Sequence, residues 1–86
     1  MPFATAQEIV RARCAPCHSM HPTQPGFSAP PANVVLDTPQ QIHLLAPQIE
    51  SVAVASTLMP LGNATHMTQH ERDLLSRWIA EGARIR

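Results

Sequence analysis

The sequence predicts a small all-α domain with three to five short helices, and three observations support this fold class. Its 86 residues are enough for one domain, which we assign to residues 1–86. Helix-start signals occur at three points in the chain, each followed by apolar residues at helical spacing. No segment shows the alternation of apolar and polar residues that is typical of a half-buried strand.

A first helix is expected just before residue 14. Thr5 followed by Glu8 has the form of a capping box, in which the side chains at a helix start bond to the backbone there. Ile9 and Val10 then supply apolar side chains. We therefore expect this helix to begin near Thr5.

Residues 22–39 are expected to form a loop. Proline fixes φ and lacks a backbone N–H, so closely spaced prolines prevent a regular helix. The prolines in this stretch are Pro22, Pro25, Pro30, Pro31 and Pro39.

A second helix is expected to begin after Thr38. Thr38 is a suitable N-cap, Pro39 suits the first helical position, and Gln41 completes a capping box. Pro47 should kink this helix or split it in two near Ala46. The apolar residues that keep helical spacing are Ile42, Leu45, Ile49 and Val52.

The clearest helix start is at Thr68, which forms a third capping box with Glu71. Gly82 supplies a stop signal. The expected apolar stripe of this helix consists of Leu74, Leu75, Trp78, Ile79 and Ala83.

Composition narrows the classes of function. Six arginines balance six acidic residues and there is no lysine, so the chain has no basic field for nucleic acid. No run of about 18 apolar residues is present, so we expect no membrane insertion by this chain. The first residues lack the features of a secretory signal, and we expect a mature or excised piece of a longer precursor.

The apolar residues are small for a chain of this length. Two Phe and one Trp are the only aromatic side chains. A domain of 86 residues is marginal unless something besides these side chains fills its centre. A large flat cofactor would supply the missing volume.

The main chemical motif is formed by Cys14, Cys17 and His18. Two thiols three residues apart can add to the two vinyl groups of one haem, and the adjacent imidazole can bind the iron. One helical turn would place both sulfurs along the same porphyrin edge. The motif therefore predicts one covalently attached haem c, with His18 as the proximal ligand.

Three other interpretations of the cysteine pair remain. The pair is also compatible with a redox dithiol, although such motifs lie on a strand-to-helix turn of an α/β fold. The pair and the histidines His18 and His21 have the chemistry of a zinc site, but a second cysteine pair is missing. A structural disulfide would not explain the adjacent histidine.

Met59 is the best candidate for the second axial ligand. It lies in a loop with Pro60 and Gly62, well downstream of His18. Met20 is too close to His18 to reach the opposite face. Met67 and a histidine are the rival candidates, but Met67 more naturally packs against the last helix. Solvated polar roles are expected for the other histidines, which are His21, His43, His66 and His70. A protein ligand at this position favours electron transfer, whereas an open position favours a haem-based ligand sensor or a peroxidase-like enzyme.

Pro30 is a further candidate for a place at the haem. An iron-binding imidazole usually donates its other ring hydrogen to a carbonyl, and the loop of Ala29, Pro30 and Pro31 is one source of that carbonyl. The alternative is that these prolines only shape a rigid loop over the haem edge. Trp78 is expected in the core between the first and last helices rather than at a haem propionate.

These residues also carry a resemblance. The cysteine and histidine motif, the later Met59-Pro60 and the last helix are together similar to a small class I-type cytochrome c. In the last helix the shared pattern is Thr68-x-x-Glu71-Arg72-x-x-Leu75-x-x-Trp78-Ile79-x-x-Gly82-Ala83. More narrowly, the chain resembles the C-terminal cytochrome c domain of membrane-bound bacterial urate oxidases. The strings that carry this likeness are Cys17-His18-Ser19, Pro30-Pro31, Leu36-Asp37-Thr38-Pro39 and Met59-Pro60-Leu61-Gly62-Asn63.

The resemblance implies a cytochrome c fold and a role in purine catabolism. A membrane-embedded domain of that family oxidises urate, and the cytochrome domain passes the electrons to a respiratory acceptor. This chain would then be a periplasmic electron-transfer domain tethered to the inner membrane, and not itself an enzyme. A free-standing soluble periplasmic cytochrome is the alternative.

Overall fold

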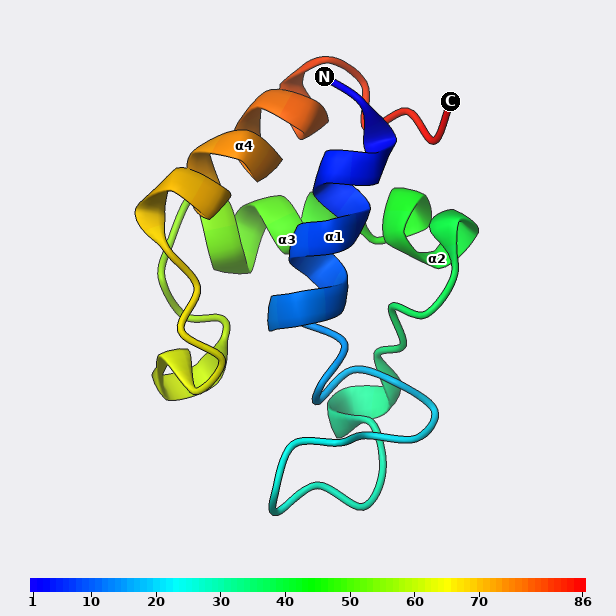
Figure 1. The fold of residues 1–86 in the computed structure, drawn as a ribbon, viewed down its shortest axis with the longest axis vertical. Helices are drawn as coiled ribbons and strands as arrows, with labels where there is room; N and C mark the ends of the chain where they lie inside the picture. Colours follow the sequence, from blue (N-terminus) through cyan, green and yellow to red (C-terminus); the bar gives the residue numbers. More distant parts are fainter.

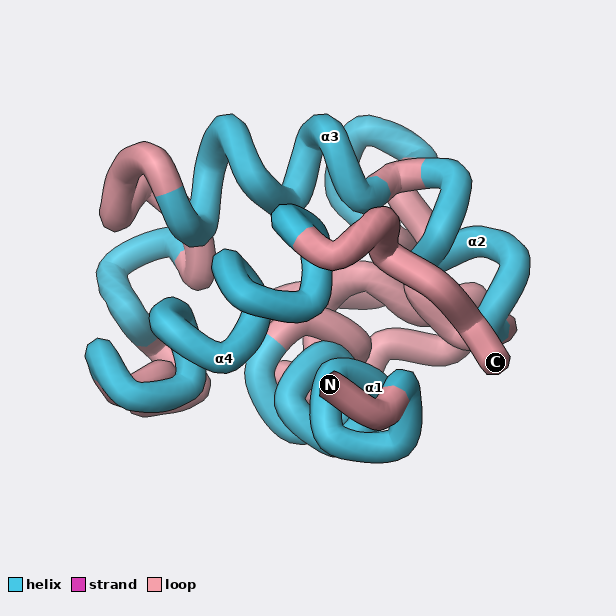
Figure 2. Tube along the Cα trace, turned by 90° about the horizontal axis from the view of Figure 1, so that it is seen from above, coloured by secondary structure: helices cyan, strands magenta, loops and turns pink.

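The computed structural model describes all 86 residues and contains helices and loops only (Figures 1 and 2). The four α-helices are α1 (Phe3–Arg13), α2 (Pro39–Leu44), α3 (Ala46–Ile49) and α4 (Gln69–Ala80). A π-helical turn, η2 (Glu50–Val54), continues α3, and two 3-10 turns are η1 (Pro31–Asn33) and η3 (Leu61–Asn63). The all-α prediction is confirmed. None of these helices combines the length and the hydropathy that crossing a bilayer requires.

The two later capping boxes form as predicted. The Thr68 hydroxyl accepts the backbone N–H of Glu71 at 3.1 Å, and the Glu71 carboxylate accepts the backbone N–H of Thr68 at 2.8 Å. Thr38 and Gln41 make the same reciprocal pair, at 3.2 and 2.9 Å. Local sequence therefore determines where α2 and α4 begin.

The first helix departs from its prediction. α1 begins at Phe3 instead of near Thr5, its N-cap is Pro2, and no side chain caps it. The Phe3 ring contacts the Trp78 ring, with centroids 5.8 Å apart and an interplanar angle of 44°. We attribute the earlier start to this packing of the first turn onto α4, because an aromatic contact outweighs a weak local signal.

The predicted helix interruptions are also found. α2 ends at Leu44, and Pro47 lies in the first turn of α3, where a missing N–H breaks no helical hydrogen bond. Leu45 between them has φ −93° and ψ 7°, outside the helical region. α4 ends before Gly82, whose φ of +110° favours glycine.

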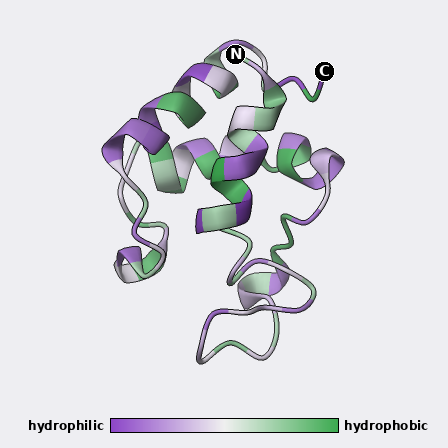
Figure 3. Ribbon diagram, viewed as in Figure 1, coloured by the Kyte–Doolittle hydropathy of each residue, from purple (hydrophilic) through white to green (hydrophobic).

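The core lies where α1 packs against α4 and α2, and where α4 packs against η2. Figure 3 shows hydrophobic segments on α1, α4 and the α3–η2 stretch. Trp78 is 1% exposed and its indole N–H donates to the Arg84 carbonyl at 2.8 Å, which confirms its core position. The buried apolar residues are Ala6, Ile9, Val10, Leu36, Ile42, Ala46, Ile49, Ala53, Met67, Leu75, Trp78 and Ala83.

Two loop regions extend from one end of this helical framework (Figure 1). We call residues 14–35 the first lobe and residues 54–64 the second lobe. No residue of either lobe is fully buried. The first lobe follows the C-terminal end of α1, and the second lobe runs from the last residue of η2 to the segment before α4.

Candidate functional site

The cysteine and histidine motif forms one hydrogen-bonded turn directly after α1. The backbone N–H of Cys14 donates to the Val10 carbonyl at 2.9 Å, which continues the helical pattern. The backbone N–H of His18 then donates to the Cys14 carbonyl at 2.9 Å. Both cysteines are free and partly exposed. The two thiols and the imidazole therefore come from a single turn, as the spacing predicts.

A backbone carbonyl orients the His18 ring. Nδ1 of His18 lies 3.1 Å from the Val34 carbonyl oxygen. Because a carbonyl only accepts, Nδ1 must carry the hydrogen, and in the neutral ring this leaves the lone pair on Nε2. This is the usual arrangement around a metal-binding histidine. The His18 carbonyl in turn accepts the backbone N–H of Leu36 at 2.8 Å, so hydrogen bonds hold both the ring and the backbone of His18.

The structure gives the orienting role to Val34 and not to the Ala29–Pro31 stretch. The Pro30 carbonyl accepts the backbone N–H of Asn33 at 3.1 Å, and the Pro31 carbonyl accepts that of Val34 at 3.0 Å. Both carbonyls are thus used to close the η1 turn, which corrects our expectation for the proline loop. The other expectation, that Pro30 shapes a loop over a haem edge, stays a prediction.

Partial burial disfavours the thiolate form of both cysteines. It raises the pKa of Cys14 to about 11, although the positive charge of Arg72 acts in the opposite direction. Burial also raises the pKa of Cys17. Redox-active dithiols instead contain a cysteine with a lowered pKa. The motif therefore lacks the electrostatic feature that activates such a pair.

Met59 lies in the second lobe, with its backbone held on both sides. Its N–H donates to the Val52 carbonyl at 2.8 Å, and its carbonyl accepts from Nη1 of Arg72, also at 2.8 Å. The other candidate, Met67, is 4% exposed and belongs to the core. The Asn63 side chain bonds to both the N–H and the carbonyl of Met67, at 2.9 and 3.1 Å. The packing role predicted for Met67 is confirmed.

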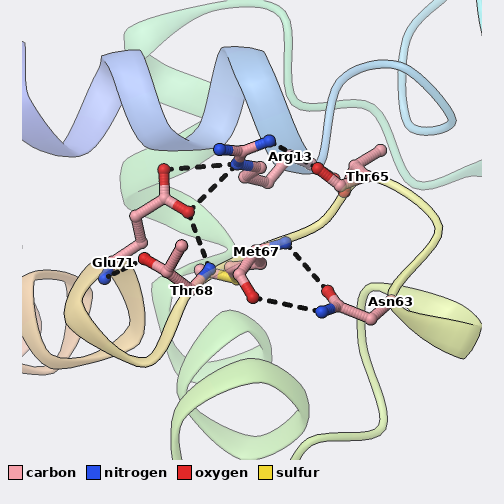
Figure 4. Close-up of polar contacts among 6 residues, drawn as sticks. All are labelled: Arg13, Asn63, Thr65, Met67, Thr68 and Glu71. Carbon is pink, nitrogen blue, oxygen red and sulfur yellow. Dashed lines mark hydrogen bonds and ion pairs between the residues drawn. The ribbon is translucent and has the colours of Figure 1, made fainter.

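A polar cluster joins the end of α1 to the segment that follows Met59 (Figure 4). Arg13, which directly precedes Cys14, pairs with Glu71 through Nε at 3.0 and 3.2 Å. Its Nη1 donates to the Thr65 carbonyl, and the Thr65 hydroxyl donates to the Arg13 carbonyl at 2.7 Å. The cysteine motif is thus bonded to Val34 and Leu36 on one side and, through Arg13, to Thr65 on the other.

The other histidines occupy the surface. His21, His66 and His70 are exposed, as expected for solvated side chains. His43 is different, because its Nδ1 lies 2.6 Å from the Ala83 carbonyl and connects α2 to the chain after α4. Sequence reasoning had assigned it no such contact.

Sequence reasoning also missed Arg13, Thr65 and Arg72. Arg72 is 6% exposed, and a signal for it does exist: it stands three residues before Leu75 and six before Trp78, on the buried face of α4. Arg13 and Thr65 are 52 residues apart and belong to no motif, so nothing in the sequence connects them.

The residues present fit a haem. Two free thiols, an imidazole with Nε2 left to bind a metal ion and a thioether held by its backbone form a suitable donor set. No three His, Cys, Asp or Glu side chains gather into a metal-binding group. The lobes that bear the four candidate residues also carry apolar side chains that are not fully buried and that a flat apolar group could cover: Phe27, Val34, Val35, Val54, Leu58 and Leu61.

Comparison with known proteins provides no family assignment. No family model, no curated protein and no solved structure matches this chain. The function must therefore be inferred from the site itself, and the likeness to cytochromes c stays a prediction.

Proposed function

We propose that this chain is an electron-transfer domain carrying one haem c, attached through Cys14 and Cys17, with His18 and Met59 as axial ligands. The observation that carries the proposal is the His18 ring. It follows two free thiols in a single turn, and its Nδ1–H is bonded to the Val34 carbonyl at 3.1 Å. A hydrogen bond of this kind to a carbonyl is typical of an imidazole that binds iron or zinc through Nε2.

The attachment chemistry requires nothing beyond the two thiols and the two vinyl groups. In each addition the sulfur bonds to one vinyl carbon and the thiol hydrogen goes to the other, so no oxidant or reductant is consumed. Both cysteines are free. The change C14S together with C17S should leave any bound haem removable by denaturation.

The iron of the bound group would supply one-electron chemistry between its ferric and ferrous forms. The chain contributes two ligands on segments that are separately fixed. His18 is held by Val34 and Leu36, and Met59 is held by Val52 and Arg72. Ligands that stay in place in both oxidation states require little rearrangement on electron transfer.

The redox partner is proposed from the resemblance alone. A tethered urate-oxidising membrane domain would deliver electrons, and a respiratory protein would accept them, on the periplasmic side of the inner membrane. The chain has no lysine, which argues against docking through a ring of ammonium groups. A tethered donor would need no such attraction, because the tether already sets a high local concentration.

The test compares M59L with M67L in protein exported through a cytochrome c maturation system. Both changes remove a thioether at nearly constant side-chain volume. The parent should retain haem after denaturation and show a low-spin spectrum with the weak red band of thioether-bound ferric iron. M59L should lose this band, bind carbon monoxide when reduced, and have a potential lower by on the order of a hundred millivolts. M67L should behave like the parent.

Other outcomes would identify other functions. Loss of the band in M67L but not in M59L would make Met67 the ligand. A high-spin parent that binds carbon monoxide rapidly would favour a ligand sensor or a peroxidase-like enzyme. A colourless protein would return the cysteine pair to zinc or dithiol chemistry.

A further inference from the structure

Arg72 is the only fully buried charged residue of the chain, with 6% of its surface exposed. It lies in the first turn-and-a-half of α4, on the face that packs against η2. None of the ion pairs in the structure includes it. A buried guanidinium without a carboxylate partner is unfavourable unless other acceptors compensate for its lost hydration.

The compensating acceptors are two backbone carbonyls from different segments. Nη1 of Arg72 donates to the Ala53 carbonyl at 2.7 Å and to the Met59 carbonyl at 2.8 Å. Ala53 belongs to the last turn of η2. Carbonyls in the last turn of a helix have no partners within the helix, and this end of the helix dipole carries a partial negative charge. One nitrogen thus joins the end of η2 to the residue proposed as an iron ligand.

The loop between these two carbonyls is closed at its base. The Met59 N–H donates to the Val52 carbonyl at 2.8 Å. Inside the loop, the Ser56 hydroxyl bonds to the Ser51 and Val52 carbonyls, at 3.2 Å each. Beyond Met59, the chain continues into the exposed η3 turn. Arg72 therefore links the Met59 carbonyl to the packed framework.

We propose that Arg72 is a positioning residue for Met59: its two hydrogen bonds hold the thioether where it can stay on the iron. This inference rests on the proposed Met59 ligation. Without the two Arg72 hydrogen bonds, only the hydrogen bond to the Val52 carbonyl would hold the Met59 backbone. The Met59 side chain would then leave the iron more often. A competing ligand would then bind the ferric iron more tightly, because it would displace the thioether from a smaller fraction of the molecules.

The experiment measures imidazole affinity of the ferric haem-loaded protein, read from the loss of the thioether band. R72M removes both hydrogen bonds and keeps an apolar chain of similar length. It should lower the imidazole Kd about tenfold or more, since hydrogen bonds from charged donors are the strong class. R72K keeps the charge but is shorter, so it should reach one carbonyl only and give a Kd between those of R72M and the parent.

Two control variants separate positioning from general effects. R77M removes an arginine from the same helix, whose side chain is 69% exposed, and should leave the imidazole Kd within about twofold of the parent. L75A weakens the core next to Arg72 without removing a hydrogen bond to Met59, since Leu75 is 0% exposed and apolar. It should destabilise the fold and leave the imidazole Kd within about threefold. A shift in L75A as large as that in R72M would reduce the effect to global loosening and overturn the proposal.

The remaining outcomes are also decisive. If R72M does not fold, R72K still tests the proposal, because an imidazole Kd equal to that of the parent overturns it. If R72M shifts the Kd and R72K does not, charge and not position is responsible, and the proposal is again overturned. If the parent itself lacks the thioether band, the Met59 ligation has failed first, and the Arg72 proposal is overturned with it. In haem-free protein, R72M should speed amide hydrogen exchange of residues 53–59, whereas R77M should not.

Discussion

The helical framework and the two lobes of this protein differ in both packing and charge. The framework contains every fully buried residue, whereas residues 14–35 and 54–64 contain none. All six arginines and all six acidic residues also lie outside the two lobes. Yet Cys14, Cys17, His18 and Met59 all belong to the lobes. The chemistry is thus proposed for the part of the molecule with the least internal support.

Hydrogen bonds to the framework can hold the candidate site in place although the lobes contain no fully buried residue. The lobes receive their order from a framework side chain and from backbone pairing, since Arg72 bonds to Met59 and Leu36 bonds to His18. Arg13 and Thr65, which directly flank the two lobes, also bond to each other. A haem between the lobes would add the apolar contacts that they lack. The framework would then set the position of the ligands, while the cofactor would complete the packing.

The largest expected effect is on the free energy of unfolding, which a leucine-to-alanine change should lower far more in the framework than in a lobe. Leu75 is 0% exposed in the framework, and L75A should lower the free energy of unfolding by about 3 kcal/mol. Leu58 is 58% exposed in the second lobe, and L58A should change it by less than about 0.5 kcal/mol. Urea denaturation followed by far-ultraviolet circular dichroism measures both.

The L58A result also reports on the cofactor. A loss of several kcal/mol in haem-loaded L58A, but not in the haem-free form, would mean that the haem buries Leu58. A large loss in both forms would contradict the division into a packed framework and unpacked lobes.

The sequence predicted most of the framework correctly, but it did not predict the first turn of α1. The caps at Thr38 and Thr68 and the interruption near Pro47 are local signals, and the structure confirms all three. α1 instead begins at Phe3, whose ring contacts that of Trp78, and no local pattern connects these two residues. Local rules therefore located helices where caps or prolines dominate, and failed where tertiary packing decides.

The candidate site was predictable only in part, for a related reason. Spacing alone placed Cys14, Cys17 and His18 in one turn, because a short motif is a local structure. The carbonyl that orients His18 comes from Val34, whose approach depends on the η1 turn rather than on its own residue type. Contacts of this kind use backbone atoms, which every residue possesses, so side-chain identity gives no signal for them.

A smaller effect is expected at Glu71, which lies in the polar cluster between the two parts. Burial raises the pKa of Glu71, but hydrogen bonds from the Thr68 backbone and from Arg13 outweigh it, so that the pKa falls below its ordinary value. A group with a lowered pKa in the folded state stabilises above its unfolded pKa, and this contribution disappears as the pH falls through the folded value. The stabilising effect should therefore be present at pH 7 and absent in strong acid.

E71Q tests this sign. It should lower the free energy of unfolding by about 1 kcal/mol at pH 7, and the difference from the parent should vanish at low pH, where Glu71 is itself neutral. Denaturation at a series of pH values measures the difference. E50Q is the control, because Glu50 is exposed and forms no ion pair in the structure. A difference that persists unchanged into acid would show that the E71Q substitution disturbs packing rather than charge.

The smallest effect concerns where electrons leave the protein. If they pass through the end that bears the two lobes, a new charge placed there should matter more than the same charge on the framework, because screening limits its reach to about 10 Å at 0.1 M salt. Thr57 in the second lobe and Gln40 in α2 are both exposed. T57K and Q40K add the same net charge, so any difference between them reports position alone.

The measurement is the rate at which ferricyanide oxidises the reduced haem-loaded protein. T57K should raise the rate constant about threefold at about 0.1 M salt and Q40K less than about 1.5-fold, with both effects lost near 0.5 M salt. Equal acceleration in the two variants would mean that only net charge matters to the encounter. A larger effect of Q40K would place the exit for electrons on the framework, and the charge-free lobes would then hold the haem without being the surface through which it reacts.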